Sequence, residues 1–317
     1  MVINQATDKA VINWQGFDIG AAASINVLQP NSSSVLLNRV VGNNPSQIFG
    51  SLTANGHVIL VNPNGIVFGA DGSVTASAFT ASTLGISDAD FLAGNYHFVG
   101  NGTNGSILNQ GSINATTGYV ALLGANVTND GKVTTNQGNV YMGAAQSITV
   151  PVSNSGRIRM ELDPSSVNAA VNNTQNGVIV TSGGQVLMQA SAVNDAMATA
   201  SITHVGKINT SAAQAGNVSL LTDGGNIRIS GIINANSTDS SKVGGDIYIG
   251  RDVTTNKLAK ATDVSGATLL SNKGFVETSG EHLATDGISI KAAEWLLDPN
   301  NIEVNLTNVA VTAGNSV

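Results

Sequence analysis

The acidic and histidine side chains are the candidates in this sequence for catalytic or metal-binding residues. Asp88 and Asp90 stand two residues apart, and paired carboxylates can serve as general acid and base when a polysaccharide is cleaved. Two solvated loop acids are the favoured interpretation, because no further acids converge on them by spacing. The four histidines are scattered without a His-x-x-x-His spacing, which predicts no metal site; they are His57, His97, His204 and His282. We therefore expect no catalytic residue, no metal and no cofactor, and we predict that the chain is not an enzyme.

The composition narrows the class of protein further. Cysteine is absent, which excludes thiol catalysis and disulfide scaffolds. Charged residues make up 10% of the chain and aromatic residues 4%, whereas an average soluble protein has roughly 25% charged residues. The net charge is -7 and no cluster of Lys or Arg occurs, so we expect no nucleic-acid partner. Hydrophobic residues reach 42%, which is enough to fold, yet no apolar stretch is long enough to span a membrane.

Short apolar runs bracketed by Gly, Asn, Asp or Ser recur along the chain, as is typical of strands joined by tight turns. Residues 109–113 recur as 129–133, and residues 118–122 recur as 138–142, both after a shift of 20. Looser copies follow. A period near 20 with two or three short strands per repeat predicts an all-β fold, a parallel β-helix in which each repeat is one rung.

The repeat also predicts how the rungs stack. At about 4.8 Å per rung, about 13–15 rungs would form a rod. Asn109 and Asn129 occupy the same position in successive repeats, where asparagine side chains can form a hydrogen-bonded ladder. Large apolar side chains such as Trp14 and Phe17 gather upstream of the regular repeats, which predicts a structural cap over the open end of the solenoid.

These patterns predict a division of the chain into segments. Helical signals are confined to residues 87–92 and 291–297. We expect the cap and first rungs over residues 1–100, regular rungs over 101–250, and the start of a further β-helix over 251–317. The first residues lack a charged segment followed by an apolar one, so we expect no signal peptide in this chain. The last residues predict a fragment of a longer protein.

The most informative stretch lies between two apolar runs and reads Asn62-Pro63-Asn64-Gly65-Ile66. Pro63 suits the second position of a turn, and Gly65 accepts a positive φ. We expect Asn62 and Asn64 to cap the corner with side-chain hydrogen bonds, and Ile66 to return to the core. From physical chemistry alone, the stretch is a tight corner.

The same stretch resembles the Asn-Pro-Asn-Gly-Ile motif of the two-partner secretion (TPS) domain, which opens filamentous haemagglutinin-type exoproteins of Gram-negative bacteria. Further ordered blocks resemble that family: residues 12–20, residues 37–40 with Asn38 and Arg39, residues 48–56 and residues 79–87. An upstream Asn-Pro-Asn-Leu motif is missing. The chain is therefore most similar to the branch of high-molecular-weight adhesins and haem–haemopexin-utilisation proteins. The resemblance implies a right-handed parallel β-helix with an N-terminal cap and extra-helical hairpins.

The resemblance also implies a function. Such domains are recognised by the POTRA domains of a cognate TpsB-type outer-membrane β-barrel transporter, and they nucleate β-helix folding during export. It implies a monomer that reaches the medium or cell surface of a Gram-negative bacterium through the periplasm. The candidate partner-recognition residues are Asn62, Pro63, Asn64, Gly65, Ile66, Asn38 and Arg39. Whether the motif contacts the transporter or only shapes the fold stays open.

Other functions remain as alternatives. One is a β-helix face that binds a host or matrix ligand, such as a glycan, haemopexin or exopolysaccharide. For the full-length protein, host cell-surface or matrix glycans and proteins are the expected partners. Another is the stalk of a contact-dependent toxin-delivery protein, and the last is a glycan-active enzyme. The ordered motifs over residues 12–87 favour the secretion domain.

Overall fold

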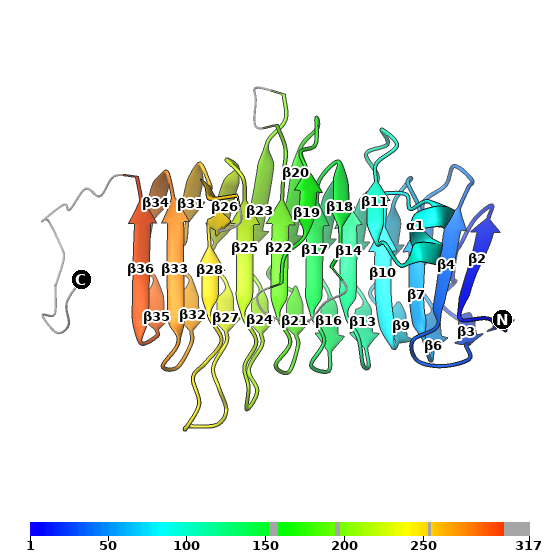
Figure 1. Cartoon of the computed structure of the whole chain (residues 1–317), viewed down its shortest axis with the longest axis horizontal. Helices are drawn as coiled ribbons and strands as arrows, with labels where there is room; N and C mark the ends of the chain where they lie inside the picture. Colours follow the sequence, from blue (N-terminus) through cyan, green and yellow to red (C-terminus); the bar gives the residue numbers. More distant parts are fainter. Residues whose placement is uncertain (152–157, 194–196, 253–254, 301–317) are drawn as a thin grey trace, which may run out of the picture.

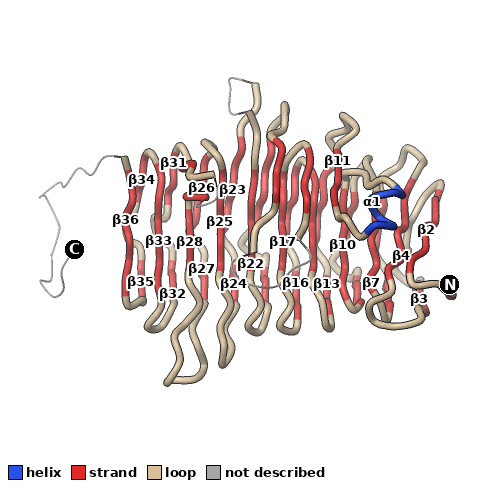
Figure 2. The backbone as a smooth tube through the Cα atoms, in the orientation of Figure 1, coloured by secondary structure: helices blue, strands red, loops and turns tan. Residues whose placement is uncertain are grey.

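The computed structural model describes residues 1–151, 158–193, 197–252 and 255–300. The described chain forms an elongated stack of short strands, with the N-terminus at one end and the strand that ends at Pro299 at the other (Figure 1). Nearly all regular structure is strand (Figure 2). The predicted all-β parallel β-helix is confirmed, because three long sheets are built of parallel strands that recur from rung to rung. No helix among the described residues has the length and apolar character needed to cross a membrane.

The first sheet has 11 strands, each paired in parallel with its neighbours. In spatial order they are β1 (Val2–Asn4), β3 (Ser24–Leu28), β6 (Ser51–Ala54), β9 (Ser73–Ala76), β13 (Ser112–Ala115), β16 (Lys132–Thr135), β21 (Val178–Val180), β24 (Lys207–Asn209), β27 (Ile232–Asn234), β32 (Thr268–Leu270) and β35 (Ser289–Lys291).

The second sheet also has 11 parallel strands. They are β2 (Lys9–Trp14), β4 (Val35–Val40), β7 (His57–Val61), β10 (Ala78–Ser82), β14 (Val120–Gly124), β17 (Val140–Ala144), β22 (Val186–Ala190), β25 (Val218–Thr222), β28 (Ile247–Ile249), β33 (Phe275–Gly280) and β36 (Glu294–Pro299).

The third sheet has nine parallel strands. They are β5 (Ser46–Ile48), β8 (Ile66–Phe68), β12 (Ser106–Asn109), β15 (Asn126–Asn129), β20 (Ala169–Asn173), β23 (Ala200–His204), β26 (Asn226–Ile229), β31 (Ala261–Asp263) and β34 (His282–Ala284). All three sheets continue across residues 100 and 250 without a break in strand order, and the division into segments at those residues stays a prediction.

Alternation of side chains explains why these segments stack as strands. In the first sheet, Ile113 lies between Val74 and Val133 in register, and all three point into a continuous buried core. The flanking residues Ser112 and Asn114 face outward. One rung cannot bury such an inward face by itself, so each rung is stabilised by its two neighbours.

A second buried core covers the outer face of the second sheet. It is roofed by helix α1 (Asp88–Ala93) and by a three-stranded antiparallel sheet of β11 (His97–Val99), β18 (Ser147–Thr149) and β19 (Glu161–Asp163). A short hairpin, β29 (Arg251–Asp252) with β30 (Lys257–Leu258), follows further along. Because the middle of the second sheet is covered on both faces, strands such as β7 and β14 are buried at every residue.

Two expectations about these elements are wrong, and one is confirmed. The first and second sheets hold 11 strands each in the described chain instead of 13–15. Segments such as residues 145–151 and 158–168 lie outside the three long sheets, so they add chain without adding a rung. The helix expected over 291–297 is largely strand β36, which pairs with β33 and sets Trp295 opposite Val276. Its short apolar run gains more from the ladder on the β33 edge than from a single isolated turn. The helix expected over 87–92 is α1.

Candidate functional site

Residues 62–66 form a corner that carries the chain from β7 in the second sheet into β8 in the third. The amide of Gly65 donates to the carbonyl of Asn62 at 3.1 Å and closes the turn. Gly65 has a φ of 121°, a backbone conformation that residues with a Cβ rarely adopt. Pro63 fixes the entry to the turn by its ring. Ile66 is fully buried in the main core.

Asn62 is the hub of this corner. Its side chain is buried, and its Nδ2 donates to the carbonyl of Asn44 and to Ser46 Oγ, both at 3.0 Å. Its Oδ1 accepts from the backbone amide of Asn64 at 3.0 Å and from Asn64 Nδ2 at 3.1 Å. Asn64 Nδ2 also donates to the carbonyl of Gly42 at 2.9 Å. The two asparagines therefore tie the corner to residues 42–46 of the preceding rung.

The following rung closes the other side of the corner. Thr103 Oγ1 donates to the carbonyl of Pro63 at 2.9 Å. A Cβ added to Gly105 would lie 2.2 Å from that same carbonyl oxygen, so only glycine lets the two rungs approach this closely. The motif is thus held between two neighbouring corners, and only Pro63 and Asn64 stay partly exposed.

Gly65→Ala is expected to lower the free energy of unfolding by about 1–3 kcal/mol, the usual strain for a residue with a Cβ at such a φ. The added Cβ would also lie 3.2 Å from the carbonyl oxygen of Ser106. Urea unfolding measures the change. Gly20→Ala is the matched control, because its added Cβ meets nothing within 4 Å and its φ is outside the left-handed region. Equal shifts in the two variants would contradict the strain argument.

Asn38 and Arg39 lie on β4, directly beside β7. Asn38 is buried, donates to the carbonyl of Ile59 at 3.4 Å and accepts from Trp14 Nε1 at 3.0 Å. Arg39 reaches outward, where its NH2 donates to the carbonyl of Ile86 at 2.8 Å and forms an ion pair with Asp88 at 2.6 Å. Arg39 therefore contacts the residues at the start of α1 and not the corner at residues 62–66.

Asp88→Asn is expected to cost no more than about 1 kcal/mol of unfolding free energy, because exposed ion pairs contribute little. The Asp88 side chain is 64% exposed. The cost should shrink further at 1 M salt, where charges are screened over about 3 Å. Urea unfolding at low and high salt checks this, and a loss of several kcal/mol would show that the pair anchors α1.

Trp14 and Phe17 lie together at the N-terminal end of the stack. Their rings meet edge to face with centroids 5.4 Å apart, and Phe17 is buried while Trp14 is half-buried. Trp14 also pairs its indole N–H with Asn38. Trp14 lies on β2, the end strand of the second sheet in the described chain. The role of Trp14 and Phe17 as a cap stays a prediction.

Asp88 and Asp90, the two acids considered for catalysis, lie in the first turn of α1. Ser87 caps the helix, accepting from the amide of Asp90 at 3.0 Å and donating to Asp90 Oδ2 at 2.7 Å. Asp88 pairs with Arg39. Within the described residues, no group of three or more His, Cys, Asp or Glu is arranged to hold a metal ion.

Two histidines are buried, which the residues around them in the sequence do not indicate. His57 faces Thr80 Oγ1 at 3.1 Å and stacks edge to face on Tyr96 and Tyr119. Burial lowers the pKa of His57 to about 3. Burial lowers the pKa of His204 to about 4, against a smaller opposite effect of its hydrogen bond to the carbonyl of Ile232. Both side chains are therefore uncharged at neutral pH.

His204 ends a ladder that begins at the two asparagines predicted to stack. Asn109 Nδ2 donates to Asn129 Oδ1 at 2.7 Å, and Asn129 Nδ2 donates to Asn173 Oδ1 at 2.7 Å. Asn173 Nδ2 then faces His204 Nδ1 at 3.1 Å. The predicted ladder between Asn109 and Asn129 is confirmed, and it runs two rungs further than the period indicated.

Comparison with known proteins places this fold in a family. Residues 1–163 match the family model of the TPS secretion domain. The heme/hemopexin-binding protein of Haemophilus influenzae strain Rd is 33% identical over 211 residues, which cover 62% of this chain and 22% of that protein. A second heme/hemopexin-binding protein from Haemophilus influenzae is 38% identical over 111 residues, which cover 35% of this chain and 12% of that protein. The chain thus spans about a fifth or less of these relatives.

Two solved structures share the architecture. The HMW1 secretion domain from Haemophilus influenzae has a TM-score of 0.70 and 28% identity, with 94% of each chain covered. The filamentous hemagglutinin secretion domain has a TM-score of 0.53 and 14% identity, with 93% of this chain and 92% of that one covered, and this likeness shows the fold alone. The family is one of secretion domains rather than enzymes. Because the family model covers more than half of the 317 residues and includes the corner at residues 62–66, the chain belongs to the TPS secretion domain family.

Proposed function

We propose that this chain is the N-terminal secretion module of a larger exoprotein, recognised by the POTRA domains of a cognate TpsB-type outer-membrane transporter. The corner at residues 62–66 carries the proposal, because it lies within the matched residues and ties three consecutive rungs together. Proteins of this family are secreted or surface-exposed in Gram-negative bacteria, and the proposed route runs through the periplasm. The module is proposed to act as a monomer.

The architecture supports folding during export. Each rung contacts only its neighbours, so a chain that emerges N-terminus first can add rungs one at a time onto those already formed. The rungs that hold the motif come early, and every later strand of the three sheets pairs with one before it. We infer that Asn62 and Asn64 act mainly by shaping this early template, since their side chains are engaged in internal hydrogen bonds.

What the full-length protein binds is a separate proposal. The curated relatives are named as heme/hemopexin-binding proteins and are about five times as long as their matched segment or longer. We propose that the full-length protein meets host cell-surface or matrix glycans or proteins through regions outside this module.

The direct test is co-expression of residues 1–317, behind a signal peptide, with candidate partner transporters. Secretion into the medium with one cognate transporter alone is expected, and retention in the periplasm is expected without it. Asn226→Ala is the matched control for motif variants, because Asn226 is exposed on β26. Export that does not depend on any such transporter would overturn the proposed function.

A further inference from the structure

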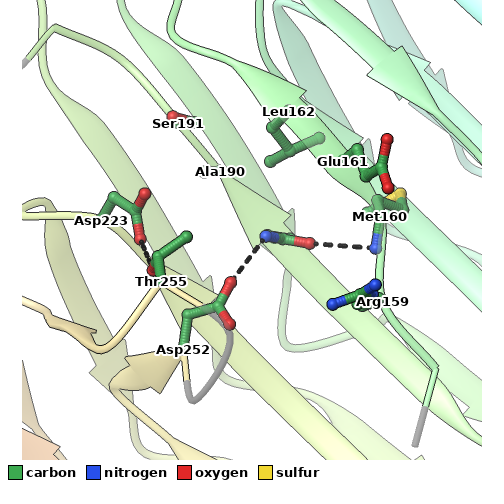
Figure 3. Close-up of a pocket in the computed structure, with 10 residues that line it drawn as sticks. Arg159, Met160, Glu161, Leu162, Ala190, Ser191, Asp223, Asp252 and Thr255 are labelled. Carbon is green, nitrogen blue, oxygen red and sulfur yellow. Dashed lines mark hydrogen bonds between the residues drawn. The ribbon is translucent and has the colours of Figure 1, made fainter.

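A cleft of about 340 Å³ lies beside the three-stranded sheet, away from the corner at residues 62–66. One wall is the chain entering β19, with Met160 and Glu161, and the floor is Gln189 on β22. The opposite wall holds Asp223, with Asp252 and Thr255 from the β29–β30 hairpin. Figure 3 shows the side chains of Met160, Glu161, Asp223, Asp252 and Thr255 around the open space. Hydrogen bonds join Gln189 to Met160 on one wall and to Asp252 on the other.

The wall formed by β19 is the edge of a sheet. β19 pairs with β18 on one side and, among the described residues, has no strand on the other. Two backbone amides two residues apart point toward that open side: Ile158 N–H donates to Gln185 Oε1 at 3.2 Å, and Met160 N–H donates to Gln189 Oε1 at 3.4 Å. A spacing of two residues is the spacing of donors along one strand edge.

The side chains of Gln185 and Gln189 occupy the acceptor positions that a neighbouring strand would fill. A glutamine side chain ends in an amide, the same chemical group as a peptide bond, so its C=O can accept where a neighbouring strand's C=O would. Gln189 also donates from its Nε2 to Asp252 Oδ2 at 3.3 Å, which completes the likeness to a bridging peptide group. Edges of this kind accept extended peptides by strand addition.

Charge indicates which peptide fits. The lining carries three carboxylates, from Glu161, Asp223 and Asp252, against one base, Arg159. Lys257 lies nearby and pairs with Asp223 at 3.5 Å. The cleft is therefore acidic overall, which favours an incoming segment with Lys or Arg side chains and disfavours an acidic one.

We propose that this cleft docks an extended, basic segment of a partner protein, which adds as a strand to the open edge of β19. The peptide carbonyls of the segment take the amides of Ile158 and Met160 from the two glutamines, and its Lys or Arg side chains face Glu161 and Asp223. This surface belongs to the folded domain, so the proposal does not depend on recognition by the transporter.

The test uses a fluorescent hexapeptide, acetyl-Thr-Lys-Val-Lys-Val-Thr-amide, titrated into the whole chain. We expect saturable binding, with amide NMR shifts centred on Ile158, Met160 and Leu162. A peptide N-methylated at alternate residues, which cannot pair as a strand, should bind at least tenfold more weakly, and a version with Glu in place of Lys should not bind. The same peptides separate strand addition from simple charge attraction.

Variants of the protein locate the site. The double variant Glu161→Gln with Asp223→Asn should weaken binding about tenfold, whereas Asp71→Asn, an exposed acid in a distant corner, should leave it unchanged. Gln189→Ala should preserve or tighten binding, because it removes the side chain that competes for Met160 N–H. Absence of saturable binding, equal binding of the N-methylated peptide, or equal loss in Asp71→Asn would each overturn the proposal.

Discussion

Asn62→Ala is expected to lower the free energy of unfolding by roughly 3 kcal/mol or more, since each buried group left without a partner costs about 1–3 kcal/mol. The substitution empties a fully buried side-chain position and leaves the buried Ser46 Oγ without its Asn62 donor. It also removes the partners of the partly buried carbonyl of Asn44 and amide of Asn64. Urea unfolding of the purified chain measures the loss. The same variant is expected to accumulate in the periplasm when co-expressed with its transporter.

Two further variants turn this measurement into a test of how the motif acts. Asn64→Ala removes only the hydrogen bonds from a half-buried side chain to Gly42 and Asn62, so a loss of about 1 kcal/mol is expected. Asn226→Ala should lose almost nothing. If the motif shapes the fold, the secretion defects follow the same order as the stability losses. If Asn64→Ala blocks secretion as completely as Asn62→Ala, the motif contacts the transporter directly and the shape argument fails.

The corner shows what local sequence can and cannot predict. The turn itself was predictable, because Pro63 and Gly65 restrict their own backbone whatever surrounds them. The partners of Asn62 and Asn64 were not, because Gly42, Asn44 and Ser46 belong to the preceding rung. They come close only once the rungs stack.

The ladder shows the same limit. Asn109 and Asn129 are 20 residues apart, so the repeat predicts that they pair. Asn173 follows Asn129 after 44 residues, and His204 follows Asn173 after 31, so neither spacing matches the repeat. The insertion of β18 and β19 breaks the period without breaking the stack. A histidine in place of the expected asparagine hides the last step. The burial of His57 beside Tyr96 and Tyr119 is a separate feature, which the repeat does not indicate either.

The helix predicted over residues 291–297 is wrong for a related reason. A short apolar run has no period long enough to distinguish helix from strand. Its conformation is decided by the edge of β33, which offers a register for every residue of β36. The cleft beside β19 was equally invisible in the sequence, because its walls come from segments more than 60 residues apart.

Acidification from pH 6.5 to pH 4 is expected to lower the free energy of unfolding by about 1.4 kcal/mol per pH unit for each buried histidine, or about 2.7 for the pair. The folded chain holds the pKa of His57 near 3 and that of His204 near 4, below the ordinary value of 6.5. The unfolded chain therefore takes up protons first as the pH falls, and stability that is complete above pH 6.5 is lost toward the folded pKa values. Urea unfolding at a series of pH values measures the slope.

The geometry of His204 makes this loss specific. Its Nε2 donates to the carbonyl of Ile232, so the uncharged ring leaves Nδ1 to accept from Asn173 Nδ2. Protonation would place a second N–H against that donor and break the end of the ladder. His204→Asn is expected to extend the ladder, because an asparagine can accept from Asn173 with its Oδ1 and donate with its Nδ2. The variant also removes one titrating group, so the free energy of unfolding should depend less steeply on pH.

Comparison of His204→Asn, His57→Gln and the double variant apportions the effect. Each single variant should remove about half of the slope between pH 6.5 and about 5, and the double variant nearly all of it. Hydrogen bonds from Ser241 and Ser265 lower the pKa of Asp239 and Asp263. The stability that these carboxylates contribute begins to fade from about pH 5 downward, as the unfolded carboxyl groups take up protons, so the part of the slope between pH 6.5 and about 5 reports the histidines. A flat wild-type profile, or an unchanged slope in the double variant, would show that the histidines become protonated without unfolding and that the buried ladder tolerates the charge.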